Sequence, residues 1–125
     1  MTQVLDAGAL IALDRNERAM WVRLKALQEE GELPVTHAGV VGQVWRGGSR
    51  QARLAAVLSG IDVKTLDDQL GRAAGELLGI TRQSDVIDAA LVLLAADGDD
   101  IVTLDREDFE VLLAATGRHV ELLCP

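Results

Sequence analysis

Short apolar runs alternate with helical patterns along the whole chain, and this alternation restricts the fold more than any other feature. Five runs have the length and apolar content of strands: Gln3–Leu5, Leu33–Thr36, Ile61–Leu66, Ile101–Leu104 and Val120–Leu123. The segments between them predict helices over Ala7–Leu13, Glu17–Glu30, Ala38–Arg46, Ser49–Leu58, Asp67–Leu78, Ser84–Ala96 and Arg106–Ala115. Strands that alternate with helices favour a mostly parallel sheet with helices on both faces. The sequence therefore predicts an α/β fold, a three-layer α/β/α sandwich with a mostly parallel central sheet.

Glycine, proline and aspartate mark the expected ends of several elements. Gly31 and Gly79 are expected to end the helices that precede them, and Asp67 to cap the helix that follows it. Pro34 cannot donate a backbone hydrogen bond, so the second strand is expected toward an edge of the sheet. The chain has no internal repeat, low-complexity tract or linker, which predicts a single domain over residues 1–125.

Composition limits the classes of protein to which this chain can belong. Apolar residues make up 49% of the chain, which is enough for a hydrophobic core. The net charge is -8, and no apolar run approaches the roughly 18 residues of a membrane span. We therefore expect a soluble cytoplasmic protein without a signal peptide or membrane segment. Cys124 is the only cysteine, which excludes an internal disulfide and a cysteine-based zinc site.

Several aspartates stand where strands end or helices begin. Asp6 and Asp105 follow apolar runs, Asp88 opens the apolar stretch from Ala89, and Asp108 stands three residues after Asp105. Loops at the carboxyl ends of neighbouring parallel strands converge on one crevice, so these carboxylates can become neighbours there. Such a group repels itself unless it is protonated or bridged by a cation, and hard oxygen ligands favour Mg²⁺ or Mn²⁺.

Helix capping is the alternative explanation for these aspartates. A carboxylate in the first turn of a helix contributes about 0.3–1 kcal/mol by interaction with the helix dipole and free amides. For each aspartate taken singly, capping explains the position well. Asp6 is the weakest case for a cap, because the segment after it is short and contains Gly8.

A local basic patch lies on this otherwise acidic chain. Arg46, Arg50 and Arg53 fall within eight residues of one another. These arginines are candidates for contacts with nucleic-acid phosphates, since the guanidinium fork matches phosphate oxygens. A solvated helix face explains them equally well, and an acidic chain also suits a basic protein partner.

Other chemistries lack their motifs. The chain has no Gly-x-Ser-x-Gly nucleophile elbow, no phosphate-binding glycine-lysine loop and no dinucleotide-binding glycine pattern. His37 and His119 are isolated, and we interpret them as packing or surface residues rather than as ligands. Trp21 and Trp45 are interpreted as core or interface anchors.

Three blocks of the sequence resemble a known family in their order and spacing. They are Val4-Leu5-Asp6-Ala7-Gly8-Ala9-Leu10-Ile11-Ala12-Leu13, Asp85-Val86-Ile87-Asp88-Ala89-Ala90-Leu91-Val92 and Val102-Thr103-Leu104-Asp105-Arg106-Glu107-Asp108-Phe109. Together they look like a PIN domain, and more narrowly the chain is similar to VapC-type toxins of toxin-antitoxin operons. The resemblance covers essentially the whole chain. It implies a magnesium-dependent endoribonuclease that is usually a homodimer and is inhibited by a VapB-like antitoxin. Any contact with DNA would be indirect, through that antitoxin.

The resemblance also implies roles for individual aspartates. Asp6, Asp88 and Asp105 match the family's acidic metal ligands, and Asp108 adds a fourth carboxylate to the catalytic set. Asp85 is a rival for the role of Asp88. We prefer Asp88 because the apolar stretch begins immediately after it and because its distance to Asp105 fits the family better.

One position departs from the family pattern. Gln43 stands where many members carry a glutamate, and an amide supplies neither charge nor a base. This difference leaves the number of metal ions open, with Gln43 restricted to a contact through metal-bound water. Two hypotheses follow. The first is a metal-dependent ribonuclease toxin, and the second is a catalytically weakened PIN-like module that acts mainly by binding its antitoxin or operator complex.

Overall fold

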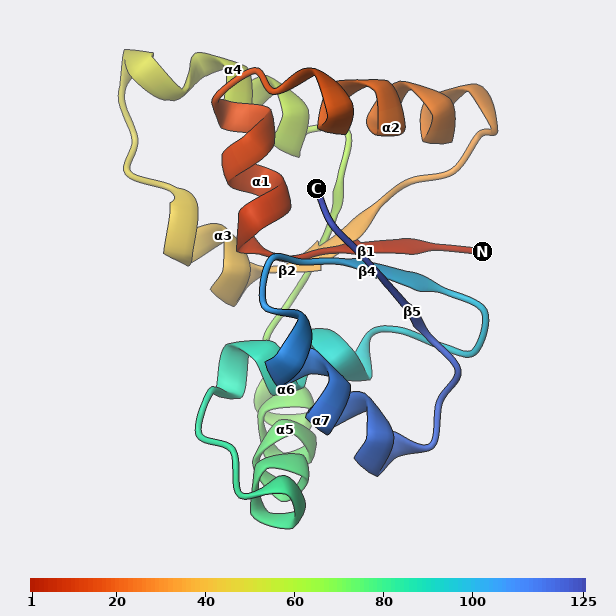
Figure 1. Cartoon of the computed structure of the whole chain (residues 1–125). Helices are drawn as coiled ribbons and strands as arrows, with labels where there is room; N and C mark the ends of the chain where they lie inside the picture. The colour runs from red at the N-terminus through yellow and green to blue at the C-terminus, as the bar shows by residue number, and fades with distance from the viewer.

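Five parallel strands cross the middle of the protein in the computed structural model, which describes residues 1–125 (Figure 1). They are β1 (Gln3–Leu5), β2 (Val35–His37), β3 (Asp62–Lys64), β4 (Asp100–Val102) and β5 (Glu121–Leu123). Their order in the sheet is β3-β2-β1-β4-β5, and every neighbouring pair is parallel. The chain builds outward from β1 to β3 and then returns to β4 on the other side of β1. The predicted parallel sheet is confirmed.

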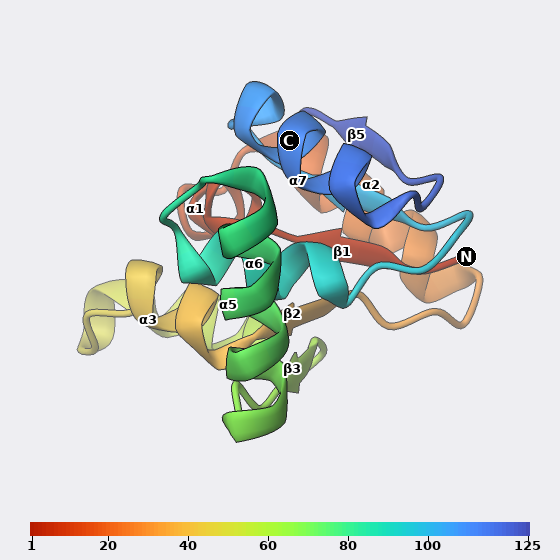
Figure 2. The same ribbon diagram turned by 90° about the horizontal axis from the view of Figure 1, so that it is seen from below.

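Helices cover both faces of this sheet. The elements are α1 (Ala7–Asp14), α2 (Arg18–Glu29), α3 (Ala38–Val44), the 3-10 turn η1 (Ser49–Gln51), α4 (Ala52–Leu58), α5 (Asp68–Thr81), α6 (Val86–Leu93) and α7 (Arg106–Thr116). Figures 1 and 2 show α1, α2 and α4 on one side of the strands and α5, α6 and α7 on the other. This arrangement confirms the three-layer α/β/α sandwich. No helix is both long and apolar enough to cross a membrane.

The central strands and α6 carry the most deeply buried part of the core. Val4 and Leu5 in β1 and Ile101 and Val102 in β4 are fully buried, as are all residues of the segment 89–92 in α6. Strands covered on both faces by helices need apolar side chains on both sides, which explains why consecutive residues of these strands are apolar. An all-apolar helix face likewise has to be buried. This packing holds the carboxyl ends of β1 and β4 and the start of α6 in fixed relation.

The predicted edge position of the second strand is wrong, because β2 lies between β1 and β3. Pro34 precedes the strand, which begins at Val35, so no ladder bond is lost at the proline nitrogen. The Pro34 carbonyl still accepts a hydrogen bond of 2.9 Å from the Asp62 amide. The proline marks the start of this strand and carries no information about its place in the sheet.

The predicted bounds of the fifth and sixth helices also differ from the structure. Gly79 does not end α5, which continues to Thr81 and stops where Arg82 adopts the left-handed conformation with φ of 58°. Glycine lowers helix stability by about 1 kcal/mol but does not forbid helical geometry. The sixth predicted helix is shorter than the range 84–96, because α6 begins after its cap at Asp85 and ends at Leu93.

The first turn of α3 lies against the first turn of α6. A Cβ built on Gly39 would meet the Ile87 Cδ1 atom in α6 and would lie 2.8 Å from His37 Cε1. Only glycine leaves room for both side chains. Gly42, in the same helix, has open space around it.

We expect Gly39→Ala and Gly42→Ala to have opposite effects on stability. Overpacking should lower the free energy of unfolding of Gly39→Ala by about 1–3 kcal/mol. Better helix propensity should raise that of Gly42→Ala by up to about 1 kcal/mol. Urea unfolding of the two variants and the wild type measures both changes. Equal effects of the two substitutions would contradict the close contact between α3 and α6.

Candidate functional site

Asp6 is buried at the carboxyl end of the central strand, next to β4. Its amide donates a hydrogen bond of 3.0 Å to the Val102 carbonyl, which extends the pairing of β1 with β4 by one residue. Asp6 occupies the N-cap position of α1, yet its side chain makes no capping bond. The residue is only 2% exposed, Oδ2 accepts a hydrogen bond of 2.7 Å from the Thr103 hydroxyl, and Oδ1 has no partner. A buried carboxylate oxygen without a partner is costly, so Oδ1 is available to a ligand.

Thr103 joins two loops of the site through one hydroxyl group. Besides donating to Asp6, its Oγ1 accepts a hydrogen bond of 3.0 Å from the Asp105 amide. The hydroxyl therefore orients the Asp6 carboxylate and holds the backbone of the turn between β4 and α7. Sequence reasoning missed this residue. The available signal was a hydroxyl side chain directly after an apolar strand and two residues before an aspartate.

Asp85 and Asp88 divide two roles in the first turn of α6. Asp85 Oδ1 caps the helix, accepting hydrogen bonds from the amides of Ile87 at 2.9 Å and Asp88 at 3.1 Å. Asp88 is 8% exposed, and no hydrogen bond occupies its carboxylate. The helix begins at Val86, so Asp88 lies within its first turn and does not precede it. The cap at Asp85 instead leaves Asp88 as the free carboxylate of this turn.

Five carboxylates influence one another at this end of the sheet, and we call them the acidic cluster: Asp6, Asp85, Asp88, Asp105 and Asp108. Burial, reinforced by repulsion from Asp6 and then from the other members, raises the pKa of Asp88 to about 7. Burial also raises the pKa of Asp6, while the hydrogen bond from Thr103 opposes this rise. The structure thus brings together the carboxylates that the sequence singled out, and their assignment as metal ligands stays a prediction.

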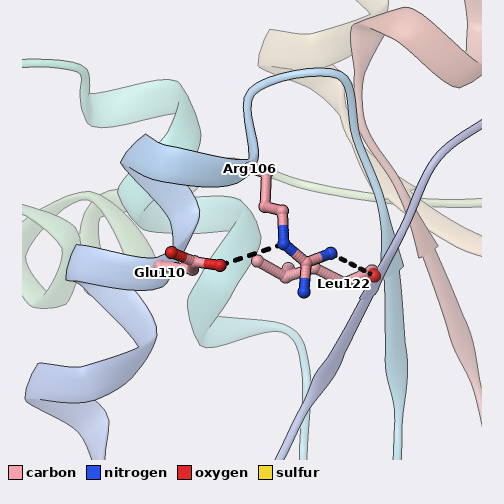
Figure 3. A network of polar contacts seen from close by, with 3 residues as sticks. All are labelled: Arg106, Glu110 and Leu122. Atoms are coloured by element: carbon pink, nitrogen blue, oxygen red, sulfur yellow. Dashed lines mark hydrogen bonds and ion pairs between the residues drawn. The ribbon is translucent and has the colours of Figure 1, made fainter.

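Two exposed members of the cluster lie at the start of α7. Asp105 occupies its N-cap position without a side-chain capping bond, and Asp108 lies in its first turn. A hollow of about 340 Å³ is lined by residues 104–108. Arg106, the basic residue in that lining, donates to Glu110 at 3.0 Å and to the Leu122 carbonyl at 2.9 Å (Figure 3). None of the ion pairs in the structure includes a member of the acidic cluster, so its charge is not neutralised by the protein.

The acidic cluster fits a cation that keeps several of its waters. No three histidine, cysteine, aspartate or glutamate side chains lie close enough together to hold one ion between them. Magnesium is usually held by one or two carboxylates and completes its octahedron with water and substrate oxygens. The donor set, with the unpartnered Oδ1 of Asp6 and the free carboxylate of Asp88, meets that requirement. Asp105 and Asp108 are exposed and can contact such an ion through water.

The histidines have the roles predicted for them, as packing and surface residues. His37 is fully buried, and its Nδ1 accepts a hydrogen bond of 3.0 Å from the Gly39 amide. Because Nδ1 accepts, Nε2 carries the proton and donates to the Ile87 carbonyl at 2.9 Å. Burial lowers the pKa of His37, which keeps the ring neutral. His119 is exposed.

Two of the three arginines in the basic patch are hydrogen-bonded to backbone carbonyls. Arg46 donates to the carbonyls at the end of α3, including that of Gln43 at 3.2 Å, and Arg53 donates to the Asp14 carbonyl at 3.0 Å. Arg50 is exposed and makes no hydrogen bond or ion pair. Gln43 is also exposed, on α3. The patch is therefore partly a set of helix and loop supports.

Comparison with solved structures finds a chain that matches along almost the whole length. The matched chain is part of the crystal structure of VapBC2 from Rickettsia felis bound to a DNA fragment from their promoter. The TM-score is 0.69, the sequence identity is 14%, and the match covers 98% of each chain. The two chains share one fold. The PIN-like fold that the sequence resemblance implied is thereby confirmed.

No family model matches the sequence, and no curated protein does. A match at 14% identity identifies the arrangement of strands and helices and leaves the chemistry to the residues themselves. Function has to be argued from the acidic cluster.

The raised pKa of Asp88 predicts a pH-dependent loss of stability. In the folded protein Asp88 keeps its proton up to about pH 7, whereas an unfolded aspartate loses it near 3.8. Between these values the folded state binds more protons, so the free energy of unfolding falls as pH rises. We expect Asp88→Asn, without added metal, to be more stable than wild type by about 2–4 kcal/mol at pH 8 and nearly equal to it at pH 4.

Urea unfolding in EDTA at several pH values measures this difference. Asp67→Asn is the matched control, because it changes an exposed cap of α5 to another good capping residue. The control should keep the pH dependence of the wild type. A constant difference between Asp88→Asn and wild type from pH 4 to pH 8 would contradict the buried, repelled carboxylate.

Proposed function

We propose that this protein is a magnesium-dependent endoribonuclease of the cytoplasm that acts as the toxin of a toxin-antitoxin pair. The observation that carries the proposal is the pair of buried carboxylates, Asp6 and Asp88, at the carboxyl end of the central strand. They carry charge that the protein does not neutralise, beside an oxygen that has no partner. A buried carboxylate pair of this kind requires a proton or a cation, and a hydrated Mg²⁺ or Mn²⁺ satisfies it.

The residues of the acidic cluster would have different roles in phosphodiester hydrolysis. Asp6 and Asp88 would hold the ion, and Asp105 and Asp108 would orient water at its outer face. A bound divalent ion supplies Lewis-acid polarisation of the phosphate and lowers the pKa of water. Thr103 keeps the Asp6 carboxylate in one orientation through its 2.7 Å hydrogen bond. Asp88 releases its proton when a cation binds, so affinity for the ion should increase with pH up to neutrality.

The partners we propose follow from the fold match and from the surface. The matched structure is VapBC2 bound to a promoter DNA fragment, which supports an antitoxin as the partner. We propose a VapB-like antitoxin, with contact to DNA only through it. Two adjoining hollows of about 380 and 250 Å³ lie along α2, and Trp21, Leu24 and Gln28 line both. An apolar antitoxin segment would fit there, with Trp21 as an anchor.

We also propose that the free protein is a homodimer. Sedimentation equilibrium of the free protein tests this proposal.

The alternative function, a catalytically weakened PIN-like module that binds antitoxin or operator complex, rests on Gln43. The exposed amide adds no charge to the acidic cluster. Both functions use the same fold and differ in whether the protein cleaves RNA.

RNA cleavage and metal binding test the proposal together. Purified protein should cleave single-stranded RNA with Mg²⁺ and not with EDTA. Asp6→Asn should lower the cleavage rate on the order of 100-fold or more, since a bound ion contributes several kcal/mol to transition-state stabilisation. Mg²⁺ should also raise the melting temperature of the wild type, because it binds the folded state, and Asp6→Asn and Asp88→Asn should abolish that increase.

Asp67→Asn serves again as the control and should keep both the cleavage rate and the metal-dependent increase in melting temperature. Metal binding without RNA cleavage would favour the weakened binding module. An identical melting shift in wild type, Asp6→Asn and Asp88→Asn would refute a shared metal site.

Arg50 is the arginine we expect to contact RNA phosphate, because its side chain is not engaged within the protein. Replacement by glutamine should weaken RNA binding and reduce the slope of log affinity against log salt by about 0.7. The melting temperature should not change. Fluorescence anisotropy with the Asp6→Asn protein, which leaves the RNA intact, measures the slope. Arg72→Gln is the control, since Arg72 is an exposed arginine paired with Asp68 on α5; equal slopes for both variants would exclude Arg50 as a phosphate contact.

A further inference from the structure

We infer that His37 is a positioning residue for the metal centre, which holds the first turn of α6 so that the Asp88 carboxylate stays beside Asp6. The inference rests on the proposed function, because it assigns a role to His37 in the same site. His37 does not itself touch the ion or the substrate in this role.

His37 links two helix starts through a single ring. Its Nδ1 accepts from the Gly39 amide in α3 and its Nε2 donates to the Ile87 carbonyl in α6, one residue before Asp88. The ring is fully buried, so water does not compete for either bond. Both bonds need the neutral ring, and the lowered pKa of His37 maintains that state. The imidazole thus acts as a rigid link of fixed tautomer between α3 and α6.

The sheet anchors the other end of this link. His37 is the last residue of β2, and the preceding Thr36 donates a buried hydrogen bond of 2.8 Å to the Leu5 carbonyl in β1. Leu5 directly precedes Asp6 in the chain. The start of α6 is therefore tied, through His37 and Thr36, to the strand that carries Asp6.

A rigid link at this place opposes the electrostatic repulsion between the carboxylates of the site. Asp6 and Asp88 are buried carboxylates without a basic partner, and repulsion between their charges acts to move the first turn of α6 away from β1. First turns of helices open easily, since their amides lack partners within the helix. The Ile87 side chain also fills the space over Gly39, which leaves the first turn little room to shift. Thr103 holds Asp6 from one side and His37 holds Asp88 from the other.

Two substitutions separate the two hydrogen bonds of the ring. Asparagine places an oxygen near the position of Nδ1, so His37→Asn keeps the cap on Gly39 and loses the bond to Ile87. Glutamine places an amide nitrogen near the position of Nε2, so His37→Gln keeps the bond to Ile87 and loses the cap. Mn²⁺ affinity by isothermal titration calorimetry is the primary readout, with circular dichroism to establish folding.

We expect His37→Asn to bind Mn²⁺ about 10–100-fold more weakly than wild type, the usual effect of removing a residue that orients a metal ligand. His37→Gln should stay within about threefold of wild type. In RNA cleavage, His37→Asn should lower kcat and leave KM nearly unchanged, because the RNA-binding surface is not altered.

The other outcomes overturn the inference in distinguishable ways. Wild-type affinity in both variants would exclude a positioning role and leave the proposed function intact. Equal loss of affinity in both variants, or loss of the folded state in both, would mean that His37 acts through general packing. A wild-type protein that does not bind Mn²⁺ would refute the proposed function and the inference together.

Discussion

The parallel pairing of β1 with β4 is the constraint on which the rest of the structure depends. These two strands join the halves of the chain at the centre of the sheet, where the direction of strand addition reverses. Residues that follow such strands meet in one place, since parallel strands end at the same edge. Asp6 follows β1 and Thr103 follows β4, and the bond between them is the local result. A different partner for β1 would leave Asp6 without its only side-chain partner.

The site is stable because burial of the surrounding apolar core outweighs the repulsion among its carboxylates. Burial of Asp6 and Asp88 beside the three exposed members of the acidic cluster opposes folding, and the raised pKa of Asp88 reflects this penalty. The fully buried apolar residues of β1, β4 and α6 supply a large opposing free energy. The hydrogen bonds of Thr103 and His37 then fix where the carboxylates stand, which apolar packing alone does not specify. Apolar packing therefore provides the stability, and a few buried polar bonds provide the geometry.

Particular elements show how far the sequence predicts the fold. The boundaries of β1 are predicted to the residue, because a short strand lies between an exposed terminus and a helix-starting aspartate. The parallel order follows from the alternation of strands and helices. Pro34 and Gly79 mislead, since a proline just before a strand removes no ladder bond and a glycine inside a helix lowers its stability without ending it. The aspartates were found because charged residues at the ends of apolar runs are conspicuous. His37 and Thr103 were missed as supports because their partners are backbone and carboxylate groups far away in the chain.

The sequence by itself determined the fold class, the acidic residue set and the exclusion of an internal disulfide or a cysteine-based zinc site, because these depend on periodicity and on residue type. Only the tertiary structure decided which aspartate caps α6 and which is free. Until the start of the helix is known, the local sequence allows either Asp85 or Asp88 to be the cap. The tertiary structure also decided that Arg46 and Arg53 donate to backbone carbonyls, whereas Arg50 has no hydrogen-bond partner in the protein. The physical reason is that hydrogen bonds and Coulomb forces depend on distances between atoms. Those distances are set by how the layers pack and not by positions along the chain.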